Sequence, residues 1–359
     1  MSRLPQRHSL PVQTAEIIHE MIICGELKDT LPSERTLATR LQIGRDTLRA
    51  ALDILELQKT ISFRQHGKRR SILRQGSGRK ATQSRRIAFI SPKELRELPP
   101  NMLIEVDTLR ELLNHRGYEF ELVTPGIFHL KNPARQLDKV LHDNRYDVWI
   151  LYQCPLQVQQ WFQKHNIPAI IRGYSNVGIE IPSLDEDWHA SAFHAGGVLS
   201  RNNHRSVGLL MPDTKLAGLA ATEIGLREAI EQSNTKGTVH KIIDSVDPSS
   251  TQRSLERALK VKNPPTALVG TRSRHTLSVI AWLAQYQLSI PREISYISLS
   301  YEHWYSHLTP SITHYYSDPT NFARSLVRNI TSYCENKKVQ PLKLLMPNYV
   351  CGESVRKLT

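Results

Sequence analysis

Apolar residues in the first part of the chain recur at the spacing of short amphipathic helices. This spacing predicts a helix over residues 10–24, a second helix after Leu31-Pro32-Ser33-Glu34, and a third that begins at Arg45 after a break at Gly44. Pro32 favours an extended entry into the second helix, and the Ser33 hydroxyl can cap its first free amides. The third helix is predicted to bury one face, made of Leu48, Ala51, Leu52 and Leu55.

A basic face of the third helix lies apart from this apolar face. Arg45 and Arg49 are four residues apart, so they share one exposed side that begins at the helix N-terminus. The alternating residues 61–64 and the tight turn 65–68 then predict a short hairpin with a basic tip. This order of elements is typical of a winged helix-turn-helix, in which the third helix enters the DNA major groove. Its hairpin reaches the minor groove or the backbone.

From Arg86 onward, the pattern changes to short apolar runs that alternate with helices. Continuous apolar runs of this length are typical of strands buried on both faces of a parallel sheet. The predicted strands cover residues 87–90, 119–123, 147–152, 168–171, 206–211, 238–243, 266–269, 294–299 and 343–349. The predicted helices cover residues 102–116, 134–143, 156–165, 188–199, 219–231, 250–261, 274–286 and 318–336. Two such α/β lobes in tandem predict a crevice for a small ligand at the carboxyl ends of their strands.

The charge and the cysteine content of the chain indicate which kind of partner and which cellular setting to expect. The 359 residues carry a net charge of +13, and residues 1–86 supply +9 of it from 17 basic and 8 acidic side chains. This uneven distribution favours a polyanionic partner for the N-terminal part. Four scattered cysteines without a CxxC pair indicate neither a disulfide framework nor a zinc site, so we expect a reducing, cytoplasmic setting. No signal peptide or membrane-spanning run is predicted.

The N-terminal segment resembles the DNA-binding domain of the GntR family of bacterial transcription regulators. The resemblance rests on Leu-Pro-Ser-Glu-Arg at 31–35, on Arg-Asp-Thr-Leu-Arg at 45–49, and on the glycine of the predicted wing turn. It departs from the family at Gly44, where Ser or Thr is usual, and at Thr36, where Glu often completes a capping box. The resemblance implies that DNA is contacted by Arg35, Arg45, Asp46, Thr47, Arg49, His66, Gly67 and Lys68.

The remaining three quarters of the chain resemble the effector-binding domain of the LacI/GalR family, which has the periplasmic-binding-protein fold. Four motifs carry this resemblance: Asn-His-Arg-Ser-Val-Gly at 203–208, Asn-Pro-Pro-Thr-Ala at 263–267, Ile-Pro-Arg-Glu-Ile-Ser at 290–295 and Leu-Thr-Pro-Ser-Ile-Thr at 308–313. The combined architecture resembles the arabinose-repressor type of sugar-responsive repressor. It implies dimerisation through the α/β domain and three crossings of the chain between lobes, with the last strand in the second lobe.

These comparisons predict three segments along the chain. Residues 1–73 are expected to form the winged-helix domain, 74–85 a flexible basic linker, and 86–359 the effector and dimerisation domain. The first lobe is predicted to comprise residues 86–187 and 317–341, and the second residues 188–316 and 342–359.

The predicted ligand crevice lacks two acidic residues that the family often has. Ser273, preceded by Arg272, stands at the first of these positions, and Ser300-Tyr301 stand at the second. Because neutral sugars are commonly held by carboxylates, we interpret Arg172 and Arg272 as a site for an anionic sugar derivative. The predicted effector residues are Tyr152, Arg172, Asp187, Arg272, Ser273 and Tyr301, with Trp304 as a further candidate.

The sequence therefore favours a ligand-responsive regulator, expected to be a repressor, that binds a palindromic operator as a homodimer. No cofactor and no metal are expected. One alternative is a regulator whose α/β domain has lost ligand binding and only dimerises. A pyridoxal-phosphate enzyme fusion is disfavoured, because no lysine stands in a convincing Schiff-base context and no GxGxxG, P-loop or HExxH motif occurs. The attached DNA reader argues against a transport-type sugar receptor, and the two-lobed domain against a purely architectural DNA-binding protein.

Overall fold

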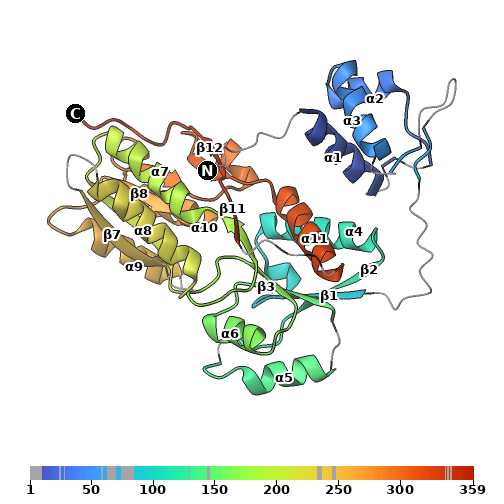
Figure 1. Cartoon of the computed structure of the whole chain (residues 1–359). Helices are drawn as coiled ribbons and strands as arrows, with labels where there is room; N and C mark the ends of the chain where they lie inside the picture. Colours follow the sequence, from blue (N-terminus) through green and yellow to red (C-terminus); the bar gives the residue numbers. More distant parts are fainter. Residues whose placement is uncertain are drawn as a thin grey trace, which may run out of the picture. The chain divides into compact units, whose positions relative to one another are not determined.

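The computed structural model forms two compact units, one built on residues up to Arg85 and the other on most of the chain from Arg86 onward (Figure 1). It describes residues 10–23, 26–27, 29–57, 60–62, 70–73, 85–128, 130–143, 146–232, 237–244, 248–335, 337, 339 and 342–359. The predicted fold class is confirmed: a helical N-terminal unit precedes an α/β unit with two mainly parallel sheets. Among the helices described, none has the length and apolar character needed to cross a membrane.

The N-terminal unit contains the three predicted helices, α1 (Leu10–Ile23), α2 (Glu34–Leu41) and α3 (Arg45–Leu57). Their apolar faces meet in one core that includes Ile18, Leu37, Leu48, Leu52 and Leu55. As predicted, Ser33 caps α2, because its hydroxyl accepts a hydrogen bond from the Thr36 backbone N–H at 3.2 Å.

The break predicted between the second and third helices is a turn over residues 42–44, after which α3 begins at Arg45 as predicted. The left-handed residue of this turn is Gln42, with φ of 53°, rather than Gly44. The Gln42 N–H closes the last turn of α2, and the Gly44 carbonyl accepts a bond from the Leu48 N–H at 3.0 Å. Gly44 therefore lies at the start of α3, where a Cβ would meet only the Thr47 hydroxyl at 3.9 Å.

Only the base of the predicted wing belongs to the described residues. Ile61 pairs with Ile72 in an antiparallel bridge, and the Ser62 N–H donates to the Ser71 carbonyl at 2.8 Å. The predicted turn, with His66, Gly67 and Lys68, lies outside the described residues, as does segment 74–84 of the predicted linker.

The second unit contains two six-stranded sheets. The first has the order β11-β5-β4-β3-β1-β2 and the second the order β12-β10-β9-β8-β6-β7. The strands of the first sheet are β1 (Arg85–Ile90), β2 (Tyr118–Val123), β3 (Val148–Tyr152), β4 (Ala169–Arg172), β5 (Ser183–Glu186) and β11 (Leu342–Leu345). Those of the second are β6 (Ser206–Pro212), β7 (Thr238–Asp244), β8 (Ala267–Gly270), β9 (Ser295–Ser298), β10 (Thr313–Tyr316) and β12 (Asn348–Val350).

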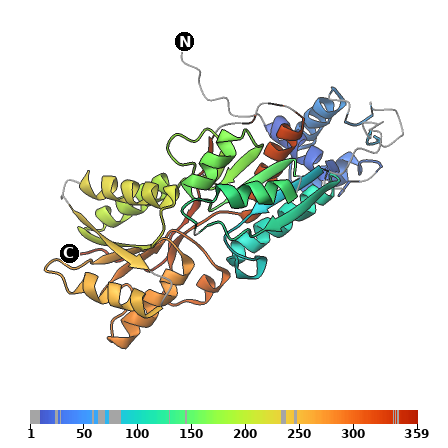
Figure 2. The ribbon, with the colours of Figure 1, turned by 90° about the horizontal axis from the view of Figure 1, so that it is seen from below.

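Helices cover both faces of each sheet. They are α4 (Pro100–Asn114), α5 (Ala134–Asp143), α6 (Leu156–Lys164), α7 (Trp188–Arg201), α8 (Ala217–Glu231), α9 (Pro248–Leu259), α10 (Ser273–Gln285) and α11 (Pro319–Cys334), with two short 3₁₀ helices, η1 (Leu95–Glu97) and η2 (His303–His307). In the second lobe, α7 and α8 lie on one side of the sheet and α9 and α10 on the other (Figure 2). Val207 and Leu209 of β6 pack with α7 and α8, whereas Leu210 packs with α9 and α10. This alternation explains why these strands are apolar throughout.

The chain passes between the two sheets three times. It leaves the first sheet after β5, returns from β10 to α11, which contacts β3, β4 and β5, and leaves again after β11. The prediction of a single last strand over 343–349 in the second lobe is wrong. Residues 342–345 add to the first sheet beside β5, and residues 348–350 pair antiparallel with β10 in the second.

Candidate functional site

The N-terminal end of α3 presents the residues predicted to contact DNA. Arg45, Asp46 and Arg49 are exposed, and Thr47 is half-buried beside the fully buried Leu48. Arg35 is also exposed, one residue into α2. The structure therefore brings the basic face of α3 to the surface and its apolar face into the core, as the spacing predicts.

A network of ion pairs links this face to the interior of the unit. The Arg49 Nε–H donates to Glu34 at 3.2 Å, and Arg70 donates to the other oxygen of Glu34 at 2.9 Å and to Glu56. Burial disfavours the charge on Arg70, but its hydrogen bonds to Glu56 and Glu34 outweigh burial and raise the pKa of the guanidinium.

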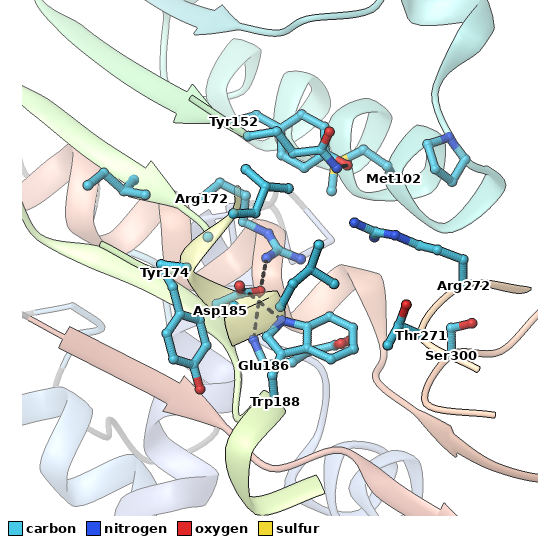
Figure 3. A pocket seen from close by; sticks show the side chains of 18 of the residues that line it. Met102, Tyr152, Arg172, Tyr174, Asp185, Glu186, Trp188, Thr271, Arg272 and Ser300 are labelled. Carbon is cyan, nitrogen blue, oxygen red and sulfur yellow. Dashed lines mark hydrogen bonds and ion pairs between the residues drawn. The ribbon is translucent and has the colours of Figure 1, made fainter. Parts of the chain in front are cut away.

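A pocket opens between the two lobes of the second unit, at the carboxyl ends of strands from both sheets (Figure 3). Of the predicted effector residues, Tyr152, Arg172, Arg272, Ser273 and Tyr301 line this pocket. Asp187 does not, because its carboxylate caps α7 by accepting from the Ala190 N–H at 2.9 Å. Trp304 packs against the apolar cluster beneath η2 instead.

The wall supplied by the first lobe is built around Arg172 at the end of β4. Its guanidinium donates two hydrogen bonds to Glu105, at 2.7 and 3.0 Å, and one to Asp185 at 2.8 Å. It also lies 4.1 Å from the centre of the Phe322 ring. Asp185 further accepts from the Glu186 N–H and from the Trp188 indole N–H, at 2.8 and 3.1 Å. Figure 3 shows Arg172, Asp185 and Trp188 converging in this way.

This geometry argues against Arg172 as an anion site. Arg172, Glu105 and Asp185 are all buried, so the arginine is already neutralised by two carboxylates. A third carboxylate, Glu186, lines the same pocket. Burial, followed by repulsion from Asp185, raises the pKa of Glu186 to about 7. Carboxylates outnumber arginines in this arrangement. The interpretation that Arg172 binds an anionic ligand therefore does not fit it.

The wall supplied by the second lobe carries hydroxyl groups and, among the described residues, fewer ion pairs than the wall supplied by the first lobe. Ser273 donates to Glu302 at 3.2 Å, and the backbone N–H of Arg272 donates to the His275 Nδ1 at 3.3 Å. The Arg272 side chain extends into the pocket from this wall (Figure 3). It forms no salt bridge with any residue that the structure describes.

A buried pair behind this wall fixes the start of α10. His275 is fully buried, and its Nε2 lies 3.0 Å from the Asp244 carboxylate. Hydrogen bonds from His275, Thr251 and Arg274 overcome the effect of burial and lower the pKa of Asp244. Burial is also the main reason why the pKa of His275 is lowered. A neutral His275 with Nε2–H directed at Asp244 leaves Nδ1 as the acceptor for Arg272.

Models of protein families match both parts of the chain. The model of bacterial regulatory proteins of the gntR family matches residues 10–69, and the model of the periplasmic binding protein-like domain matches residues 197–355. The chain is a DNA-binding transcription regulator that joins these two domains. A search of curated proteins finds no match to the regulator.

Solved structures share the fold of the regulator's second unit. A LacI regulator from Bacillus cereus subsp. cytotoxis has a TM-score of 0.68 at 13% identity, over 77% of the regulator and 100% of that chain. A transcription-regulator-like protein from Staphylococcus haemolyticus has a TM-score of 0.64 at 17% identity, with the same coverage. A LacI-family regulator from Enterococcus faecium, with bound ribose, has a TM-score of 0.63 at 14% identity, again with that coverage.

Several residues lining the regulator's pocket were missed from the sequence. Asp185 and Glu186 lie on β5, a strand that was not predicted because the segment Ser183-Leu184-Asp185-Glu186 has only one apolar residue. Glu302 stands one position beyond Ser300-Tyr301, where an acidic residue was sought. An acidic residue was therefore present near the expected position, but one or two residues further along the chain.

Proposed function

We propose that the regulator binds a palindromic operator as a homodimer and that a neutral sugar in the pocket between its lobes controls this binding. The observation that carries the proposal is the pairing of carboxylates with aromatic rings in one pocket. Asp185, Glu186 and Glu302 line it together with Trp188 and Tyr301. Carboxylate oxygens accept hydrogen bonds from hydroxyl groups, and aromatic faces pack against the apolar face of a sugar ring.

The charge of the pocket favours a neutral sugar over a sugar phosphate or acid. Three carboxylates and two arginines line it, and Arg172 is already paired with Asp185 and with Glu105. An anion would meet Arg272, which forms no salt bridge with a described residue. It would also be repelled by Glu302 and by the ionised fraction of Glu186, whose pKa is about 7. The bound ribose in the Enterococcus faecium regulator supports a sugar of this kind.

Contact with DNA is assigned to the exposed face of α3 and the start of α2. Arg45, Asp46, Thr47 and Arg49 would face the major groove and Arg35 the backbone. The prediction that His66, Gly67 and Lys68 also contact DNA concerns residues outside those that the structure describes. Ligand that binds between the lobes favours one lobe arrangement and thereby changes the population of dimers able to engage both half-sites. Relief of repression by ligand is the arrangement we expect.

A ligand screen of the whole protein tests the proposal. Thermal unfolding would be followed with ribose, arabinose and glucose, and with ribose 5-phosphate, glucose 6-phosphate and glucuronate. A sugar present at 100 times its dissociation constant should stabilise the fold by about 2.7 kcal/mol, which raises the unfolding midpoint. A response only to the phosphates or the acid would refute the neutral-sugar assignment. No response to any class would support the alternative of a domain that only dimerises.

The DNA assignment is tested on duplexes selected for binding from a random pool. Arg45→Ala and Arg49→Ala should each weaken binding to the selected duplex by about 1–3 kcal/mol if the arginine reads a base. Unchanged affinity in both variants would refute the assignment of α3. Sedimentation of the free and DNA-bound protein would test the dimer directly, because a homodimer on a palindrome predicts two chains per duplex.

A further inference from the structure

Glu34 places a negative charge beside the predicted DNA-contacting face of α3. Its side chain is 23% exposed, and its two oxygens accept from different arginines. One oxygen accepts from the Arg49 Nε–H at 3.2 Å, and the other from Arg70 at 2.9 Å. A carboxylate in this place repels DNA phosphates, so its contribution to binding has to come from what it does to its neighbours.

The contact with Arg49 uses the side of the guanidinium, and its two terminal nitrogens form no hydrogen bond with any other residue that the structure describes. Glu34 engages Nε, whereas the two terminal nitrogens form the fork that binds a guanine or a phosphate through parallel hydrogen bonds. Among the described residues Arg49 also pairs with Asp46, whose oxygen lies 3.9 Å from one terminal nitrogen and whose side chain is fully exposed. With 49% of its side chain exposed, Arg49 is therefore oriented at one edge and accessible at the other.

Glu34 is itself held by a buried partner. The Arg70 side chain is only 8% exposed and also donates to Glu56, near the end of α3. The Arg70 carbonyl accepts from the Leu31 N–H at 2.9 Å, just before α2 begins. The carboxylate thus has a fixed position relative to α2, to α3 and to the segment that follows the wing. A fixed carboxylate can fix the plane of the guanidinium bonded to it.

We propose that Glu34 is a positioning residue that presents the fork of Arg49 to DNA and thereby raises sequence specificity. The proposal rests on the assignment of Arg49 to DNA contact. An arginine oriented before binding loses less side-chain freedom when it forms a forked contact, which favours the correct base. Binding to random DNA gains little from this orientation, and Glu34 still repels the phosphates of random DNA. Glu34 should therefore strengthen binding to the operator and weaken binding to other sequences.

The test compares affinities of Glu34→Gln for a selected operator duplex and for a random duplex of equal length. We expect about 3- to 10-fold weaker operator binding and unchanged or up to about 3-fold tighter random binding. The ratio of the two affinities should fall by about 10-fold. If Glu34 acts through Arg49, this fall should disappear when Arg49→Lys is already present, because lysine has no fork to orient.

Two matched variants separate positioning from simpler roles. Glu56→Gln weakens the other partner of Arg70 without touching Arg49, and Glu26→Gln removes the same charge from an exposed pair with Arg40. Equal tightening on both duplexes would mean that Glu34 only repels phosphate. Equal weakening on both, shared with Glu56→Gln and accompanied by a lower unfolding midpoint, would mean that it only stabilises the fold. Either outcome overturns the proposal. An Arg49→Ala variant with unchanged affinities would overturn the DNA-contact assignment as well.

Discussion

The two walls of the ligand pocket use charge in opposite ways. The first-lobe wall holds Arg172 buried between Glu105 and Asp185, each within hydrogen-bonding distance. The second-lobe wall holds Arg272, which reaches into the pocket and has no salt bridge with any described residue. The side chains of the first wall are already bonded to one another in the absence of a ligand, at the cost of desolvating several charges. The second wall keeps a cation and hydroxyl groups that can still reorient.

This contrast shows why the residue type alone does not define a binding role. Arg172 ends a parallel strand of the first sheet and Arg272 follows one of the second, and both line the pocket. Only the partners distinguish them, because carboxylates from α4 and β5 already satisfy Arg172. A ligand that met Arg172 would have to displace part of this network, whereas Arg272 has no such bonds to break.

The largest expected effect comes from removing the cation of the first wall. Arg172→Leu leaves Glu105 and Asp185 as buried carboxylates without their partner, and should destabilise the second unit by about 3–5 kcal/mol. Arg272→Leu in the second wall should change stability by less than about 0.5 kcal/mol. Urea unfolding followed by tryptophan fluorescence measures this unit specifically, because all five tryptophans lie beyond residue 86. Equal losses in the two variants would contradict the comparison.

The next effect depends on pH. Burial raises the pKa of Glu186 from its ordinary 4.5 to about 7, so between these pH values the folded protein keeps a proton that the unfolded chain has lost. Stability should therefore fall as pH rises from 4.5 to 7 and then level off, by up to about 3 kcal/mol.

Glu186→Gln should remove this pH dependence. The variant should be more stable than the parent at pH 8. Near pH 4 it should be no more stable, because residue 186 is then mainly uncharged in both the folded and the unfolded chain. Thermal unfolding at a series of pH values measures the difference. Asp187→Asn is the neighbouring control, since it removes one negative charge but keeps an acceptor for the Ala190 N–H at the start of α7. A parallel response of both variants at every pH would show that Glu186 keeps its charge.

A smaller effect is expected at Trp188, whose indole donates to Asp185. Trp188→Phe keeps an aromatic ring but removes this donor, and should cost about 1–2 kcal/mol. Trp282→Phe makes the same change at a buried indole whose N–H has no hydrogen-bond partner within the described parts of the chain. The difference between the two variants in urea unfolding isolates the hydrogen bond. No difference would mean that the bond to Asp185 contributes nothing.

The smallest effect is expected in the second wall. Ser273→Ala removes a hydrogen bond to Glu302 at 3.2 Å, in a partly exposed position, and should cost about 0.5–1 kcal/mol. Calorimetric unfolding can resolve a change of this size. A loss as large as that of Arg172→Leu would show that the second wall is as tightly organised as the first.

Local patterns predicted the fold well, because helices and buried strands are recorded in short stretches of sequence. The apolar positions of α3, Leu48, Leu52 and Leu55, repeat at helical spacing and are all buried. The strand β3 is apolar along its whole length and fully buried. In contrast, β5 contains Ser183, Asp185 and Glu186, and its pattern does not distinguish a central strand from a loop.

The candidate site could be predicted only in part. Tyr152, Arg172, Arg272, Ser273 and Tyr301 follow from their places near strand ends, and all five line the pocket. Their electrostatic surroundings do not follow in the same way. Glu105 is 67 residues from Arg172 in the chain, and nothing in the local sequence of either residue indicates that they meet. The net charge of the pocket therefore required the three-dimensional arrangement.

The three connections between the lobes have a mechanical consequence. Two of them are joined where they pass between the sheets, because the Asp187 N–H donates to the Leu345 carbonyl at 2.9 Å. Three connections restrict the relative motion of the lobes more than a single connection would, and they favour rotation over sliding. A ligand bound between the lobes, as proposed, would then set how far the lobes open. In a rotation of this kind, a shift of a fraction of an ångström near the axis becomes a larger displacement at the far ends of the lobes.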